Sequence, residues 1–212
     1  MKIYGANLPS NLKPSDVDLG PGATVKRVIK ATPTVATVEV EAAAGLPPGL
    51  RDVTVAGATA VKALTIYDKI AYVKVAPTGG MARLGGTIAP KEYMQFETIA
   101  YANGPDGKSN TADDLPLGPV DAAWSLEEFY STPDDDDIKY VGSVNDSGLF
   151  TPNIEGPNPA RKKQENNYPT NNWGDVWVNA SYRDGDKTFK ARSYLVVTIP
   201  LYVRYDQPEV SK

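Results

Sequence analysis

A loop rich in side-chain oxygens, over residues 103–114, contains the residue types best suited to chemistry in this sequence. Asp106, Asn110, Asp113 and Asp114 offer carboxylate and amide oxygens among glycine and other turn-forming residues. A hard cation such as Ca²⁺ takes about six to eight oxygen ligands, so these four side chains are candidate calcium ligands. The spacing is not that of an EF-hand, and the same residues suit a polar hairpin loop built on Asp-Gly turn chemistry. Both interpretations remain open.

Four adjacent aspartates at residues 134–137 form a second acidic group. Successive side chains of a strand point to opposite faces, and paired-carboxylate catalysis needs groups that converge from different elements. Glu127 and Glu128 are also adjacent, so they are poor candidates for paired-carboxylate catalysis for the same reason. We therefore predict a solvated loop at 134–137, with completion of the cation site as the alternative. A solvated loop is also predicted for residues 161–163, the only basic triplet.

Trp173 and Trp177 are candidate interface residues. A predicted strand that begins near Asp175 has one apolar face, formed by Val176, Val178, Ala180 and Tyr182, and Trp177 falls on the opposite face. If the apolar face packs in the core, Trp177 is exposed, and an exposed tryptophan is a typical interface anchor. Two alternatives remain open: Trp177 packs under a loop of its own domain, such as 152–172, or it serves as a sugar-binding platform.

The chain contains neither cysteine nor histidine. This composition excludes thiol nucleophiles, disulfides, Cys-x-x-Cys-His haem attachment, Cys/His zinc sites and histidine acid–base catalysis. We therefore predict that the chain is not an enzyme by itself, that it has no covalently bound cofactor, and that its role is one of scaffolding or binding.

The charge balance and hydropathy limit the partners. Acidic residues outnumber basic ones by 26 to 22, a net charge of −4, which argues against nucleic acid as a partner. No segment approaches the ~18 apolar residues of a membrane span, and the first residues have no apolar signal-peptide core. The sequence is therefore expected to be cytoplasmic or the mature part of an exported protein, and the absence of cysteine fits both.

Apolar residues recur with a period of two, which predicts β-strands. Residues 36–42, 51–55 and 71–75 each place alternate apolar side chains on one face: Ala36, Val38, Val40 and Ala42; Val53 and Val55; Ala71, Val73 and Val75. Proline and glycine at 45–49 and 77–80 predict turns. Short alternating strands separated by such turns indicate a β-sandwich, and no convincing helix is found.

The composition changes near residues 76–90, where we place a domain boundary. The predicted fold is all-β, with two tandem immunoglobulin-like β-sandwich domains over 1–85 and 86–212. The second domain is expected to have long loops at 102–120 and 145–172. Its residues 122–127 place Ala122, Trp124 and Leu126 on one face, and a tryptophan buried on a central strand is typical of immunoglobulin-like sandwiches.

The last predicted strand covers residues 195–205, which is long for a globular sheet. Pro200 removes a donor from the hydrogen-bond ladder, so it predicts a sheet edge or a bulge.

Several stretches resemble one known family in the same order. They are residues 12–22, 49–55, 103–108, 111–114, 124–128, 174–178 and 195–205. Together they resemble the C-terminal half of the α subunit of quinohemoprotein amine dehydrogenase. In that family this half consists of two consecutive immunoglobulin-like β-domains.

The resemblance implies a structural role. The family enzyme is periplasmic, oxidises primary amines with a tryptophan-derived quinone in a γ subunit, and passes electrons to c-type haems in the N-terminal domain of the α subunit. This cysteine-free chain can hold neither group, and no catalytic residue of the family carries over. The implied function is a non-catalytic scaffold or interaction module that binds other protein subunits, in a periplasmic or extracellular location.

A different class of function also fits. An extracellular structural protein, such as a surface-layer, adhesin or filament subunit, could bind copies of itself through edge strands. The long predicted strand at 195–205 favours this alternative. A hydrolase that uses only carboxylates has no supporting signal beyond the acidic residues themselves.

Overall fold

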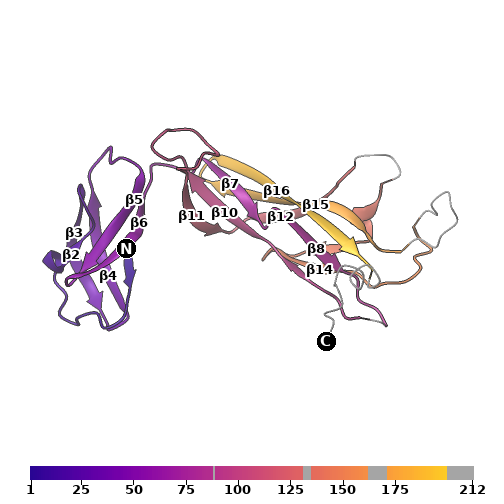
Figure 1. The fold of residues 1–212 in the computed structure, drawn as a ribbon, viewed down its shortest axis with the longest axis horizontal. Helices are drawn as coiled ribbons and strands as arrows, with labels where there is room; N and C mark the ends of the chain where they lie inside the picture. The colour runs from indigo at the N-terminus through magenta and orange to yellow at the C-terminus, as the bar shows by residue number, and fades with distance from the viewer. Residues whose placement is uncertain (88, 131–134, 162–170, 200–212) are drawn as a thin grey trace, which may run out of the picture. The chain divides into compact units, whose positions relative to one another are not determined.

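The computed structural model describes residues 1–87, 89–130, 135–161 and 171–199 (Figure 1). The chain divides into two compact units, Met1–Ala71 with Tyr101–Leu117 and Tyr72–Ala100 with Gly118–Lys212. The described residues form strands and two short 3₁₀ turns, η1 (Pro14–Asp16) and η2 (Asp137–Lys139), so the predicted all-β, sandwich-type fold class is confirmed. The boundary near residue 85 stays a prediction. No helix within the described ranges has the length and apolar character needed to span a membrane.

The first unit contains two three-stranded sheets. One has the order β1-β4-β3, from β1 (Lys2–Tyr4), β4 (Val35–Ala42) and β3 (Ala23–Ala31). The other has the order β2-β5-β6, from β2 (Val17–Asp18), β5 (Gly49–Val55) and β6 (Ala58–Ile66). The predicted alternation is confirmed in β5 and in the first half of β4, where Ala36, Val38, Val53 and Val55 are all buried. Val40 is only half-buried, and Ala42, at the end of β4, is exposed, so the prediction is wrong for Ala42. Side chains from both sheets meet in one hydrophobic cluster, as a sandwich requires.

The second unit is built around a four-stranded sheet of order β12-β15-β16-β8. Its strands are β12 (Ala123–Glu128), β15 (Gly174–Asp184), β16 (Lys187–Thr198) and β8 (Gly79–Arg83). A second sheet has the order β13-β14-β9, from β13 (Gly142–Val144), β14 (Leu149–Pro152) and β9 (Met94–Gln95). A further sheet has the order β11-β10-β7, from β11 (Leu115–Val120), β10 (Glu97–Ala102) and β7 (Tyr72–Ala76).

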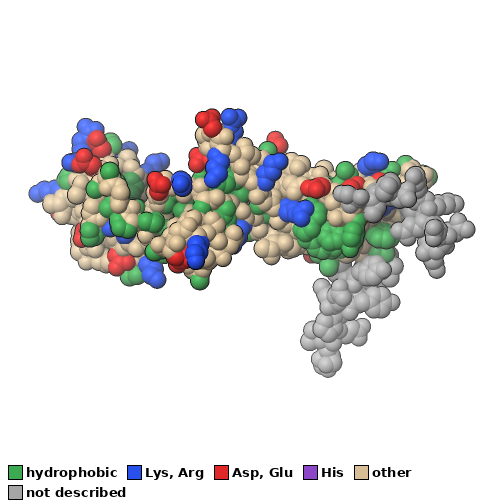
Figure 2. Space-filling view, turned by 90° about the horizontal axis from the view of Figure 1, so that it is seen from above, with side chains coloured by type: hydrophobic (Ala, Val, Ile, Leu, Met, Phe, Trp, Pro, Cys, Tyr) green, Lys and Arg blue, Asp and Glu red, His purple; other side chains and the backbone are tan. Residues whose placement is uncertain are grey.

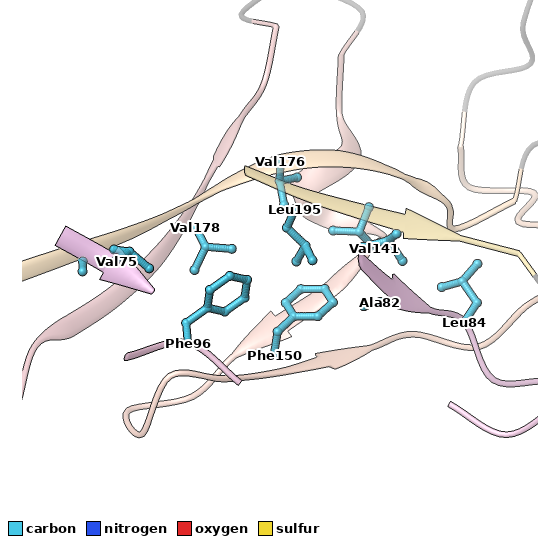
Figure 3. Packing of buried hydrophobic residues seen from close by; sticks show 11 residues of the cluster. Val75, Ala82, Leu84, Phe96, Val141, Phe150, Val176, Val178 and Leu195 are labelled. Carbon is cyan, nitrogen blue, oxygen red and sulfur yellow. The ribbon is translucent and has the colours of Figure 1, made fainter. Parts of the chain in front are cut away.

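The core of the second unit lies against one face of the four-stranded sheet. Val176 and Val178 of β15 and Leu195 of β16 point toward the rings of Phe96 and Phe150 (Figure 3). All five side chains are fully buried. Because successive residues of a strand face opposite ways, burial of Val176 and Val178 directs the residue between them, Trp177, to the other face.

The strand predicted at 195–205 differs from the observed one. β16 begins at Lys187 and pairs antiparallel with β15 over its length, while residues 194–198 also pair in parallel with β8. The described part of the predicted strand is therefore paired on both sides, and the expectation of an edge is wrong there. Pro200 and the residues after it lie outside the described ranges.

Two predicted loops contain strands. β11 lies within the loop predicted at 102–120, and β14 lies within the loop predicted at 145–172. Both strands are short, and prolines interrupt their alternation, so the pattern at period two is weak in each. Trp124 lies on β12, which is at one end of the described sheet order and not at its centre.

Candidate functional site

The acidic loop forms a compact hairpin connection between β10 and β11, closed by its own hydrogen bonds. Asp113 accepts hydrogen bonds from the Asp106 backbone N–H at 3.1 Å and from the Thr111 hydroxyl at 2.8 Å. Asp114 accepts one from the Thr111 backbone N–H at 2.9 Å, and Asp106 accepts one from the Lys108 backbone N–H at 2.8 Å. These hydrogen bonds hold the carboxylates of three predicted ligands, Asp106, Asp113 and Asp114, in place within the loop.

The hydrogen bonds of this loop favour its ionised form. Donation by the Asp106 backbone N–H and then by the Thr111 hydroxyl lowers the pKa of Asp113 below its ordinary value. Asn110, the fourth predicted ligand, adopts the left-handed region with φ +63°. In the described part of the chain, no group of three or more His, Cys, Asp or Glu residues is arranged to hold a metal ion. The calcium role of Asp106, Asn110, Asp113 and Asp114 stays a prediction.

The calcium hypothesis has a direct thermal test. A ligand that binds only the folded state raises the melting temperature, so removal of bound Ca²⁺ by a chelator is expected to lower it. Differential scanning calorimetry with Ca²⁺ and with excess chelator measures this change, and Asp113→Asn serves as a variant with a weakened site. An identical melt in both buffers would remove calcium from the description of this loop.

The most developed surface feature is an aromatic cluster on the outer face of the four-stranded sheet. It comprises Phe129, Tyr130, Trp177 and Tyr194. The Phe129 ring centroid lies 5.1 Å from that of Trp177, 4.7 Å from that of Tyr194 and 4.8 Å from that of Tyr130. Trp177 and Tyr194 face each other at 5.8 Å because their residues are register partners across β15 and β16.

Charged and polar side chains fix this aromatic cluster in place. The Arg192 guanidinium lies 4.1 Å from the Trp177 ring centroid, which is a cation–π contact. The Tyr194 hydroxyl donates a hydrogen bond of 2.9 Å to the Asp175 carboxylate. Trp177 is half-buried by these neighbours, whereas Tyr130 remains 65% exposed. Sequence periodicity predicted that Trp177 lies on the outer face of its strand, but it did not predict that the rings of Phe129 and Tyr194 pack against it.

Trp173, the second predicted interface residue, lies beside a different group. Its side chain is 43% exposed, and the Arg161 guanidinium lies 6.0 Å from its ring centroid. Arg161 also donates a hydrogen bond of 2.6 Å to the Trp173 carbonyl oxygen. The two tryptophans therefore have separate immediate partners, and the interface role of Trp173 and Trp177 stays a prediction.

Arg161 and Asp137 form a buried ion pair that overturns the solvated-loop prediction for both residues. Asp137 is 6% exposed and accepts hydrogen bonds from Arg161 Nη2 and, at 2.8 Å, from the Asp175 backbone N–H. A Cβ at Gly174 would collide with the Asp137 carboxylate, so glycine there makes room for the pair. Sequence reasoning missed this pair because its partners are 24 residues apart and no periodicity links them.

Tyr194 is expected to titrate above the ordinary range of a tyrosine side chain. Burial first, and then the hydrogen bond to Asp175, raise its pKa to about 12 from the ordinary value near 10. The folded protein therefore holds this proton more tightly than the unfolded chain does. Its contribution to stability is complete below about pH 10 and is lost as the pH rises toward 12. The tyrosinate absorbance of the native protein, minus that of Tyr194→Phe, should show one group titrating near pH 12; a midpoint near 10 would contradict the burial.

Comparison with known proteins identifies both halves of the chain. The family model for quinohemoprotein amine dehydrogenase, alpha subunit domain III, matches residues 1–68, and the model for domain IV of the same subunit matches residues 73–210. No curated protein matches. The crystal structure of human protocadherin-24 EC1-2 is similar at 12% identity over 91% of this chain and 83% of that chain, with a TM-score of 0.33, which does not establish a shared fold. The two consecutive matches, over a chain of sandwich-type sheets, show that it belongs to the quinohemoprotein amine dehydrogenase alpha-subunit family, as domains III and IV.

Proposed function

We propose that this chain is a non-catalytic scaffold whose β-domains bind other subunits of a periplasmic amine-oxidising assembly. Its membership in the family as domains III and IV supports this proposal. A sequence without cysteine or histidine also suits a structural part better than a reaction centre. The aromatic cluster on the outer sheet face is the observation that carries the proposed binding role.

The outer face has the composition of an interface centre. Protein interfaces concentrate binding energy in tryptophan, tyrosine and arginine, and Trp177, Tyr194 and Arg192 lie together here. The opposite face of the same sheet already packs the hydrophobic core, so these aromatic side chains are not needed to fill it. Figure 2 shows a large hydrophobic area on the second unit, and contiguous exposed areas of this kind mark interaction sites.

The contacts favour a protein partner over a sugar. A sugar platform needs an open aromatic face, but the Arg192 guanidinium lies over the Trp177 ring at 4.1 Å. The hydrogen-bonded pair of Asn179 and Glu127, 2.9 Å apart, occupies polar groups that a sugar would otherwise bind. A flat surface of aromatic side chains, arginine and paired polar groups instead resembles the centre and rim of a protein interface.

The described strands do not favour self-association through edges. Residues 194–198 of β16 are paired on both sides. β6, at one end of its sheet, has a register shift opposite Arg51 and Val53, and it places Lys62 at φ +53°. A bulge and a lysine are common protections of a strand edge against pairing with another chain. Among the described residues, these two strands therefore do not favour the alternative of an extracellular structural protein that binds copies of itself.

Replacement of the aromatic side chains tests the proposal. Trp177→Ala and Tyr130→Ala should each weaken binding to a haem-bearing partner complex from the same source. The loss should be at least about tenfold, because interface tryptophan and tyrosine are frequent hot spots worth ~2 kcal/mol or more. Tyr93→Ala is the matched control, since Tyr93 is 53% exposed and is not part of the cluster.

Native mass spectrometry and the visible absorption spectrum of the protein, purified gently from its own source, identify the polypeptide that it binds. Recovery with a haem-bearing polypeptide and a Soret band is the expected result. A colourless homopolymer, or equal binding by all three variants, would contradict the scaffold proposal. Because Tyr130 is largely exposed, its replacement separates loss of binding from loss of folding.

A further inference from the structure

Two basic side chains, Lys190 and Arg192, lie on the outer face of the four-stranded sheet, along β16 from the aromatic cluster. We call them the basic pair. Both residues are exposed. They face outward because the residues that alternate with them on β16, among them Ser193 and Leu195, are buried on the core side. The outer face therefore combines aromatic rings with positive charge on neighbouring positions of one strand.

No acidic residue lies opposite the basic pair. The register places Arg192 opposite Asn179 and Lys190 opposite Ser181, and both of these partners are neutral. Within the part of the chain that the structure describes, neither Lys190 nor Arg192 forms an ion pair. Arg183 of β15 also faces outward, but acidic residues follow it at the hairpin end of the sheet, so the argument rests on the basic pair alone.

The two acidic residues on the outer face of β12 and β15 near the aromatic cluster have other partners. Glu127 accepts a hydrogen bond of 2.9 Å from Asn179, and Asp175 accepts one of 2.9 Å from the Tyr194 hydroxyl. Their carboxylates are therefore held by neutral groups and do not neutralise the basic pair.

The first unit shows the opposite arrangement. On β3, Lys26 and Arg27 each form an ion pair with a glutamate of the neighbouring strand β4, Glu41 and Glu39 respectively. Opposite charges on neighbouring strands stabilise a sheet, and this chain uses them there. The basic pair on β16 has no such carboxylates, so its charge is available to a second molecule.

Contact with Trp177 prepares Arg192 to bind a carboxylate. The guanidinium lies over the Trp177 ring, 4.1 Å from its centroid, which restricts the positions that the long side chain can adopt. A guanidinium on an aromatic face keeps the N–H groups at its edge, and these match the two oxygens of a carboxylate. Less side-chain freedom is then lost when a partner binds.

We infer that this outer face binds an acidic segment of a partner protein, whose apolar side chains cover the aromatic cluster and whose carboxylates pair with Arg192 and Lys190. Alternate residues of a strand lie about 6.7 Å apart, so an extended segment with acidic residues at every second position has carboxylates at the matching spacing. Figure 2 shows Lys and Arg side chains beside the hydrophobic area of the second unit. The inference rests on the proposed interface role of this face and adds the charge of the partner.

Charge variants test the inference on the haem-bearing partner complex from the same source. At low ionic strength, Arg192→Gln combined with Lys190→Gln should weaken binding of the full chain at least about tenfold. Lys26→Gln combined with Arg27→Gln is the matched control, because it removes the same charge from cations that already have carboxylate partners, and its affinity should stay within about twofold. Salt at about 0.5 M should narrow the difference between the two variants, because it screens exposed charges.

Synthetic peptides test the same face without the complex. The full chain is titrated with acetyl-Leu-Thr-Glu-Thr-Glu-Thr-Glu-amide and, separately, with the peptide in which glutamine replaces each glutamate. Isothermal calorimetry and quenching of tryptophan fluorescence should show saturable binding of the acidic peptide and at least about fivefold weaker binding of the glutamine peptide. The variant without the basic pair should bind both peptides equally weakly.

The outcomes separate this inference from the scaffold proposal. If Trp177→Ala weakens binding to the haem-bearing complex and loss of the basic pair does not, the inference is wrong and the scaffold proposal stands. If the acidic peptide binds through the basic pair but no haem-bearing polypeptide is recovered, the scaffold proposal is wrong and the inference stands. Equal binding of the two peptides would overturn the inference, as would tighter binding of heparin than of the acidic peptide, which would assign the face to a sulfated polysaccharide.

Discussion

Replacement of Asp137 by alanine is expected to lower the free energy of unfolding of the second unit by about 3–5 kcal/mol. The carboxylate is 6% exposed and pairs with Arg161 Nη2, whose guanidinium belongs to a side chain that is itself only 12% exposed. Removal of Asp137 leaves the Arg161 guanidinium in a poorly hydrated place, where the Asp136 carboxylate, 3.3 Å from Arg161 Nε, compensates its charge only in part. The loss is therefore much larger than the ~0–1 kcal/mol typical of exposed ion pairs.

Several further contacts depend on the same carboxylate. Asp137 accepts a hydrogen bond from the Asp175 backbone N–H at the start of β15, and Arg161 donates to the carbonyl oxygens of Asn171 at 2.9 Å and Trp173 at 2.6 Å. The pair thus joins η2 and the segment around Arg161 to the chain that enters β15. Its removal should also release the contact between Arg161 and Trp173.

Chemical denaturation of three variants measures this effect. Asp137→Asn keeps the shape and part of the hydrogen bonding but not the charge, so its destabilisation should fall between that of the native protein and Asp137→Ala. Asp186→Ala, at an exposed position of the same unit, should change stability by less than about 0.5 kcal/mol. If Asp137→Ala changed stability no more than Asp186→Ala, the ion pair would not be buried in solution.

Replacement of Phe150 by alanine should destabilise the second unit by a similar amount, about 3–5 kcal/mol. Phe150 is fully buried on β14, and its ring lies among Phe96, Val141 and Leu195 (Figure 3). Loss of the ring removes the favourable transfer of apolar surface from water and leaves a cavity that the surrounding strands can fill only in part.

The conservative variant Phe150→Leu separates volume from aromatic character. Leucine keeps most of the apolar volume, so its cost should be at most about 1.5 kcal/mol if neighbouring side chains repack. Thermal unfolding followed by near-UV circular dichroism reports both variants, with a fall in melting temperature of about 2–4 °C for each kcal/mol lost. A loss below ~1.5 kcal/mol for Phe150→Ala would show that this core is not the one that stabilises the unit.

The sequence by itself determined the class of fold and the orientation of the strongest strands. Alternation at period two placed Val53 and Val55 inward on β5 and separated Val176 and Val178 from Trp177 on β15, as observed. This succeeds because a strand turns each successive side chain to the opposite face, so a local pattern suffices. Composition also excluded cysteine and histidine chemistry without any structure.

Only the tertiary structure decided which distant groups meet. The position of β16 between β15 and β8 depends on pairing between residues more than a hundred positions apart, which no local pattern records. The same is true of the contacts that join Phe129, Trp177 and Tyr194, and of the burial of Asp137 with Arg161. Charge runs read locally suggest solvated loops, but burial and pairing are set by long-range packing, and that packing reversed the prediction for Asp137 and Arg161.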